Sequence, residues 1–136
     1  MKILKIILVM SLFSFSAYAD EKRLYKELNM ISDMNNLQAR LERSFYNALY
    51  FEDFSKQKLI DIQVKEIVSK FSEYSNEHPT FNYCFYASQE LLKMWEVKKN
   101  ILNTELNKKT AKEMFKYQEK ISEFKMYCIN NIISIL

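Results

Sequence analysis

The chain has 136 residues and a formal net charge of +3, and it contains no glycine and a single proline. The lack of glycine excludes the glycine-rich loops that hold phosphate groups in nucleotide-binding proteins. A total charge so close to neutral also argues against a general nucleic-acid-binding protein. The composition therefore favours long helices and a function that requires no bound nucleic acid.

The first 19 residues have the features of a secretory signal peptide. A basic start is followed by an apolar run over residues 6–15 and by an Ala-Tyr-Ala sequence at residues 17–19. This pattern predicts cleavage after Ala19 and a periplasmic or secreted location. The apolar run is too short for a membrane span, so we expect no stable membrane insertion after cleavage. Removal of the two lysines in this segment would lower the formal charge from +3 to +1.

Residues 21–50 are predicted to form the first helix of the mature domain. Their apolar positions recur in steps of three and four, which is typical of one buried helix face. The positions are Leu24, Leu28, Ile31, Met34, Leu37, Leu41, Phe45 and Leu49. Asn35 and Asn36 are weak helix formers and could bend or interrupt the helix there.

A second helix is predicted to follow, with Asp53 or Ser55 as its N-cap. Adjacent apolar pairs argue against a strand, because they break the alternation that a strand would need. The helix is expected to end in residues 75–79, because the residue before a proline disfavours helical geometry. Its buried stripe would be Ile60, Val64, Ile67, Phe71 and Tyr74.

The last two helices are predicted to form an antiparallel hairpin closed by a disulfide between Cys84 and Cys128. Residue 106, midway between them, lies in an asparagine-rich break before a capping box at residues 110–113. Helices that rise about 1.5 Å per residue from a bend there would bring both cysteines to the same height. Two buried free thiols are the alternative, which an oxidising compartment disfavours. The two apolar stripes are Phe81, Cys84, Ala87, Leu91, Trp95 and Leu102, interrupted by Lys98, and Met114, Tyr117, Ile121, Phe124, Cys128, Ile132 and Ile135.

These segments predict an all-α protein with one domain over residues 20–136. Four amphipathic helices joined by short connections favour an up-down four-helix bundle, and two paired hairpins are the variant. The single histidine, His78, lies before a proline at a helix end, where a capping residue is the expected role. We therefore expect no metal ligand, no cofactor and no catalytic residue, and the protein is interpreted as a non-enzyme.

Two surface features are candidate sites for a protein partner. The turn of the hairpin is basic, and a solvated tip is the default interpretation. The alternative is that Lys108, Lys109 and Lys112 attract an acidic partner. Aromatic residues also cluster at two helix junctions, where core and rim packing is expected and an exposed patch for a partner is the alternative. The candidates there are Tyr46, Phe51, Tyr83 and Tyr86.

Part of the hairpin resembles the small periplasmic lysozyme-inhibitor-like family. The resemblance covers residues 84–128 and is carried by Cys84, the Leu-Asn pair at 102–103, Gln118 and Cys128. Ile121 and Lys125 stand where the family pattern has Trp and Arg, and the last spacing is one residue short. The resemblance implies a helical hairpin pinned by a cystine, and the inhibition of a cell-wall hydrolase.

Together these observations suggest an exported binding protein that inhibits a cell-wall hydrolase or gives immunity against one. A rigid hairpin end would block the cleft of the enzyme, and rigidity would lower the ordering cost of binding. The alternative is a periplasmic structural or chaperone-like protein that binds envelope or unfolded partners through aromatic surface.

Overall fold

The computed structural model describes the backbone of residues 2–104 and 106–134, and side chains from Asp20 onward within these ranges. Among these residues the structure is helical with short connections, and it contains no strand. The helices are α1 (Lys2–Phe51), α2 (Gln57–Glu77), α3 (Asn82–Asn103) and α4 (Lys108–Ile133), with a short 3₁₀ turn, η1 (Pro79–Phe81), before α3. The predicted all-α class is confirmed.

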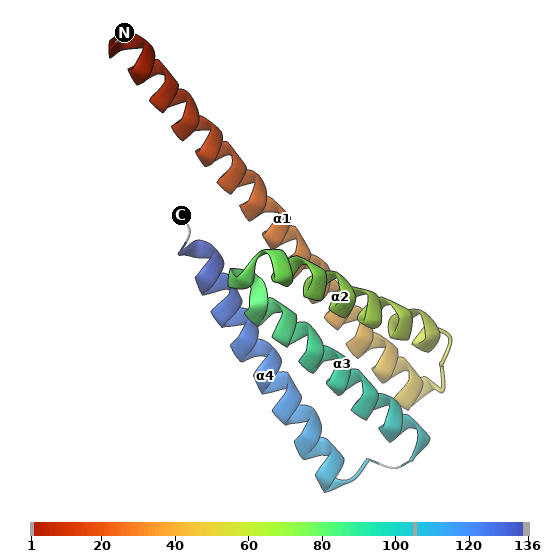
Figure 1. Ribbon diagram of the computed structural model, residues 1–136. Coiled ribbons are helices and arrows are strands. Elements are labelled where there is room, and N and C mark those ends of the chain that lie inside the picture. The colour runs from red at the N-terminus through yellow and green to blue at the C-terminus, as the bar shows by residue number, and fades with distance from the viewer. Residues whose placement is uncertain (1, 105, 135–136) are drawn as a thin grey trace.

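Helix α3 is the central element of the fold. The chain reverses direction at each connection, and α3 packs against α4, α2 and α1 (Figure 1). Large side chains of α3, including Leu91 and Trp95, are fully buried at these contacts. The α1–α2 connection and the α3–α4 connection lie at one end of the protein, and η1 lies at the other (Figure 1).

The N-terminal part of α1 extends beyond the ends of the other helices (Figure 1). The predicted signal peptide lies here, and its side chains are outside the described residues, so it stays a prediction. Within the described part of the chain, none of the helices has the length and apolarity that a membrane crossing needs.

The buried face of α1 differs from the predicted stripe at both ends. Leu28 and Leu49 are exposed, whereas Glu27, Ser44 and Ala48 are buried. After Leu37 the prediction used successive steps of four residues, which turn a stripe by about 80° over eight residues of a helix with 3.6 residues per turn, and this drift places Leu49 outside the buried face. No interruption occurs at residues 35–36, because α1 is continuous through them.

The start of α2 lies later than predicted and lacks the predicted cap. The helix begins at Gln57, and no side chain caps it. Instead, Asp53 Oδ1 accepts a hydrogen bond from the backbone N–H of Ser55 at 3.0 Å, within the connection. The predicted end is confirmed, since α2 stops at Glu77 before the proline of η1.

The C-terminal hairpin is confirmed, with one correction at its turn. Cys84 and Cys128 form a disulfide, with Cα atoms 5.2 Å apart, and both side chains are fully buried. The N-cap of α4 is Asn107 rather than Thr110. The Asn107 side chain accepts from the Thr110 N–H, and the Thr110 hydroxyl accepts from the Asn107 N–H, at 2.9 and 3.1 Å. An asparagine caps as well as a threonine does, so the helix begins one turn earlier than predicted.

Candidate functional site

An aromatic face covers α3 and α4 outside the disulfide. We define it as Tyr83 and Tyr86 of α3 with Phe124 and Tyr127 of α4. Each pair is spaced by three residues, which places both of its members on one side of their helix. The ring centres of Tyr83 and Tyr127 are 5.2 Å apart, and those of Tyr86 and Phe124 are 5.8 Å apart. The four rings therefore form one continuous surface across two helices.

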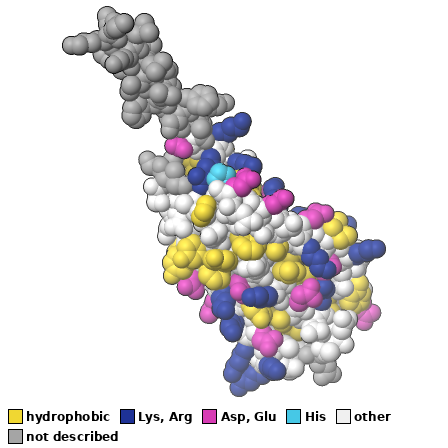
Figure 2. Space-filling view, in the orientation of Figure 1, with side chains coloured by type: hydrophobic (Ala, Val, Ile, Leu, Met, Phe, Trp, Pro, Cys, Tyr) yellow, Lys and Arg dark blue, Asp and Glu magenta, His cyan; other side chains and the backbone are white. Residues whose placement is uncertain are grey.

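The three tyrosines of this face are exposed to similar extents, 37% for Tyr83, 39% for Tyr86 and 42% for Tyr127. Phe124 is half-buried beneath them and packs against the core. Figure 2 shows apolar side chains gathered in a band across this region of the protein. Tyr83 and Tyr86 therefore form part of an exposed patch, the alternative to the core and rim packing that the sequence favoured.

Two tyrosines of the aromatic face lie beside the disulfide, where the two helices are covalently joined. Tyr83 and Tyr127 each immediately precede a bridged cysteine, Cys84 or Cys128, in the sequence. Because each cysteine points into the core, its neighbour lies about 100° around the helix and faces outward. The disulfide therefore fixes the distance between the two helices at the position of the tyrosines.

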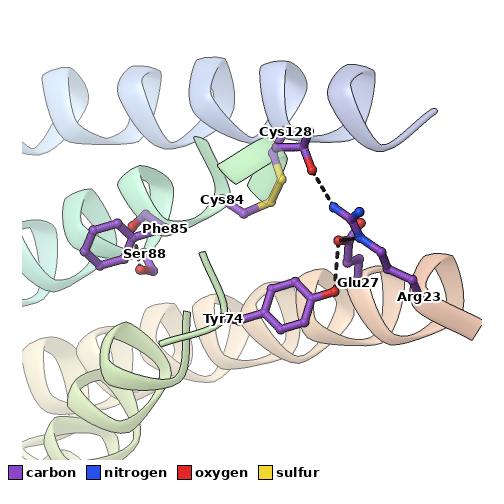
Figure 3. The surroundings of a disulfide bond; sticks show 8 residues. Arg23, Glu27, Tyr74, Cys84, Phe85, Ser88 and Cys128 are labelled. Atoms are coloured by element: carbon purple, nitrogen blue, oxygen red, sulfur yellow. Dashed lines mark hydrogen bonds and ion pairs between the residues drawn. A yellow bond between two sulfur atoms is a disulfide. The ribbon is translucent and has the colours of Figure 1, made fainter. Parts of the chain in front are cut away.

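A polar cluster joins α1 and α2 beside the disulfide. Tyr74 donates a hydrogen bond to Glu27 Oε1 at 2.9 Å, and Arg23 forms an ion pair with the same oxygen at 2.8 Å. Arg23 also donates to the hydroxyl of Thr80 at 2.6 Å. Figure 3 shows the Arg23 side chain lying beside Glu27 and pointing toward Cys128. The cluster holds the first two helices against the end of the hairpin that the disulfide joins.

Burial changes the proton affinity of this cluster. Loss of hydration, followed by the hydrogen bond to the Glu27 carboxylate, raises the pKa of Tyr74 to about 12. Burial alone would lower the pKa of Arg23, but its hydrogen bond to Glu27 leaves it raised. Both groups therefore keep their protons at neutral pH, and the arrangement serves as a structural contact.

His78 lies at the end of α2, where its ring packs against that of Tyr74 with centres 4.4 Å apart. Its backbone N–H donates to the carbonyl of Tyr74 at 3.0 Å, as a C-cap does. Among the described residues, no group of three or more His, Cys, Asp and Glu side chains could hold a metal ion.

A second aromatic cluster lies at the C-terminal end of α1. Tyr46 packs against Tyr50 and Phe51, with ring centres 4.6 and 6.1 Å apart. All three are at least half-exposed. Tyr46 and Phe51 are thus exposed rather than packed in the core, and they lie at the opposite end of the protein from the aromatic face (Figure 1). The four aromatic residues predicted from the sequence therefore belong to two separate surfaces.

The three predicted lysines lie together at the start of α4. Lys108, Lys109 and Lys112 are exposed, and with Glu113 and Lys116 they line a shallow groove. Lys and Arg side chains are visible at this end of the protein in Figure 2. Lys112 precedes Phe124 by twelve residues, or about 18 Å along a helix, so the lysines lie beyond the aromatic face.

The prediction missed Phe124 and Tyr127 as members of the aromatic face. Phe124 was assigned to the buried stripe of its helix, and Tyr127 was not singled out. Their spacing of three residues, with Tyr127 next to a bridged cysteine, was the available signal. Only the packing of α4 on α3 places them beside Tyr83 and Tyr86.

Comparisons of this chain with protein-family models, with curated proteins and with solved structures find no match.

Proposed function

We propose that this is an exported, non-enzymatic binding protein that inhibits a cell-wall hydrolase or gives immunity against one. The partner would bind the aromatic face of the C-terminal hairpin. In this proposal the four helices form one up-down bundle, and α1 and α2 support the hairpin.

The observation that supports this proposal best is the continuous aromatic face on two helices that are covalently joined. Tyrosine and phenylalanine are enriched where proteins bind one another, because they bury a large area with few rotatable bonds. A surface held by a disulfide loses little conformational entropy when a partner binds. Three tyrosines between 37% and 42% exposed leave much of this area available.

The lysines at the start of α4 would add electrostatic attraction to the binding of a partner. Lys108, Lys109 and Lys112 are exposed and close together, so they create a local positive potential. Such a potential increases the rate of association with an acidic partner, and added salt reduces the effect. In this proposal the lysines steer the partner, and the aromatic face holds it.

The test measures binding and inhibition with the oxidised protein lacking residues 1–19. Purified muramidases and amidases would be assayed on suspended cell walls, with complex stoichiometry measured by calorimetry. We expect one-to-one inhibition of one enzyme, weakened about tenfold or more by Tyr83→Ser with Tyr86→Ser. The matched control is Tyr46→Ser with Phe51→Ser, which removes two exposed aromatic rings elsewhere and should leave inhibition unchanged.

The lysines are tested separately by changing all three to glutamate. We expect a lower association rate, a smaller dependence on salt and an almost unchanged dissociation rate. Equal loss of binding in the aromatic variant and its control would remove the aromatic face from the proposal. Failure to bind or inhibit any hydrolase would contradict the proposed function itself.

A chaperone-like role in the periplasm is the second candidate. It is supported by the other aromatic cluster, where Tyr46, Tyr50 and Phe51 are exposed together with Phe54. Exposed apolar patches of this kind can bind unfolded chains. Suppression of the aggregation of an unfolded client, lost in Tyr46→Ser with Phe51→Ser and kept in Tyr83→Ser with Tyr86→Ser, would favour this role.

A further inference from the structure

We propose that a pocket between the end of α1 and the start of α2 binds a small organic anion. The pocket has a volume of about 250 Å³ and is lined by eight residues. They are Arg40, Arg43, Ser44, Asn47, Asp53, Lys56, Leu59 and Ile60. This site is separate from the aromatic face and does not depend on the function proposed above.

The charge of the lining favours a negative ligand. Arg40, Arg43 and Lys56 are basic, and Asp53 is the one acidic residue in the lining. Hydrogen bonds from Ser55, first from its side chain and then from its backbone N–H, lower the pKa of the Asp53 carboxyl. Three cations against one carboxylate leave a local excess of positive charge.

The start of α2 adds donors and a positive dipole end. No side chain caps this helix, and Leu59 and Ile60 of its first turns line the pocket. The first N–H groups of a helix have no partner within the helix, and they attract anions together with the helix dipole. The N–H groups of Gln57 and Ile60 already donate to the carbonyl groups of Phe54 and Lys56. A carboxylate or phosphate group in the pocket would therefore accept from the N–H groups of Lys58 and Leu59, which lie between them.

Ser44 provides an independent indication of a ligand. It lies in the lining of the pocket and is only 4% exposed, and its hydroxyl has no hydrogen-bond partner among the described residues. Buried hydroxyl groups in folded proteins almost always have a partner. Ser44 also occupies a core position of α1 between Leu41 and Ala48, where an apolar residue would pack without this cost. In this proposal the Ser44 hydroxyl, whose oxygen is covered by protein atoms in this structure, turns toward the pocket and donates to the anion.

The other residues that line the pocket, and its volume, indicate the size and the uncharged part of the ligand. Leu59 and Ile60 are apolar, and Arg40 is partly engaged, since its Nη1 donates to Gln63 Oε1 at 2.6 Å. Pockets for drug-sized ligands usually measure about 300–1,000 Å³, so this pocket fits a smaller molecule. The ligand class is a carboxylate or phosphate with a short apolar group that contacts the two aliphatic side chains.

The experiment titrates the folded, oxidised protein with hexanoate, hexyl phosphate and inorganic phosphate, and follows backbone amide signals by NMR. We expect saturable shifts confined to residues 40–60, with tighter binding of the two hexyl compounds than of inorganic phosphate. Arg43→Gln should weaken binding about tenfold, the size expected for a charge-assisted hydrogen bond. The matched control is Lys109→Gln, which changes the charge equally at the other connection and should leave affinity unchanged.

Ser44→Ala separates a binding role from a purely structural one. Removing a buried hydroxyl without a partner should leave the unfolding midpoint equal or higher, while the affinity for the anion falls. Shifts spread over all basic surfaces, or equal effects of Arg43→Gln and Lys109→Gln, would overturn the proposal. So would unchanged affinity in Ser44→Ala, or binding to anionic phospholipid vesicles without binding to the soluble compounds.

Discussion

The α3–α4 hairpin and the α1–α2 pair differ in what holds their helices side by side. The hairpin is joined by a disulfide and by apolar packing, and among the described residues no ion pair links its two helices. The α1–α2 pair has no covalent link, and hydrogen bonds such as Tyr74 to Glu27 and Arg40 to Gln63 join it. Apolar contacts are insensitive to pH, whereas a polar contact with an ionisable partner depends on the protonation state of that partner.

The two pairs also meet through polar contacts. Asp61 of α2 accepts from Lys99 at 2.6 Å and from the Trp95 indole at 3.3 Å, both on α3. Lys98 of α3 is buried and pairs with Glu42 of α1 at 2.9 Å. The two helices of the hairpin are therefore joined covalently, whereas the first two helices are held against it by specific ion pairs and hydrogen bonds.

Removal of the disulfide should have the largest effect on stability. The double variant Cys84→Ala with Cys128→Ala should lose about 4 kcal/mol in free energy of unfolding, from the loop of 44 residues that the bridge closes. Urea unfolding of the oxidised protein and the variant measures this loss. If reduction of the disulfide shifted the unfolding midpoint no more than a surface substitution does, the prediction would be contradicted.

The α1–α2 pair should respond most to the loss of the Tyr74 hydroxyl. Tyr74→Phe removes a hydrogen bond to a buried carboxylate, and we expect a loss of about 1.5–3 kcal/mol. Tyr25→Phe is the matched control, since Tyr25 is 61% exposed, and it should be nearly neutral. Equal unfolding midpoints for both variants would show that the Tyr74–Glu27 contact contributes nothing.

The same tyrosine predicts how stability changes at alkaline pH. The pKa of Tyr74 is raised from 10.0 to about 12 in the folded protein, so the unfolded chain releases this proton first. Its contribution is complete below pH 10 and is lost as the pH rises toward 12. Unfolding measured at several alkaline pH values should show this loss in the wild-type protein and a smaller one in Tyr74→Phe.

The contact between the two pairs should respond to acid. Hydrogen bonds from Lys99 and then Lys65 lower the pKa of Asp61 from 3.8 to about 2. Its contribution is therefore complete above about pH 4 and is lost as the pH falls toward 2. Asp61→Asn should lower the free energy of unfolding at neutral pH by about 1 kcal/mol, a modest loss because the carboxylate is partly solvated. The stability of this variant should fall less in acid than that of the wild-type protein.

The smallest effect is expected at the α1–α2 connection, and it should be a gain. Glu52 has a backbone φ of 53°, in the left-handed region, which costs a residue other than glycine about 1–2 kcal/mol. Glu52→Gly should stabilise the protein by about 0.5–1 kcal/mol, part of the gain being lost to the greater freedom of glycine in the unfolded chain. Glu52→Ala keeps the Cβ atom and should bring no such gain, which thermal unfolding can check.

Much of the C-terminal hairpin could be predicted because its signals are local. The stripes of α3 and α4 have helical spacing, and the two cysteines lie at equal distances from the turn between residues 103 and 108. The capping error at residue 107 shows the limit of such signals, since Asn107 and Thr110, three residues apart, are both residue types that can begin a helix.

The polar contacts between helices could not be predicted in the same way. Lys98 was expected to interrupt the apolar stripe of α3, and it does so by pairing with Glu42 and lying 4.2 Å from the ring of Phe45. The partners are 56 residues apart in the sequence. A charged residue at a buried position indicates that a partner exists, but helical spacing alone does not identify it.

The sequence by itself determined the helical class and the pairing of Cys84 with Cys128, because both follow from residues that are close along one hairpin. The tertiary structure alone decided that Glu27 and Ser44 are buried, that Leu28 and Leu49 are exposed, and that the predicted aromatic residues form two surfaces. The physical reason is that every helix offers several possible faces to its neighbours. The face that becomes buried depends on the packing of segments far apart in the chain.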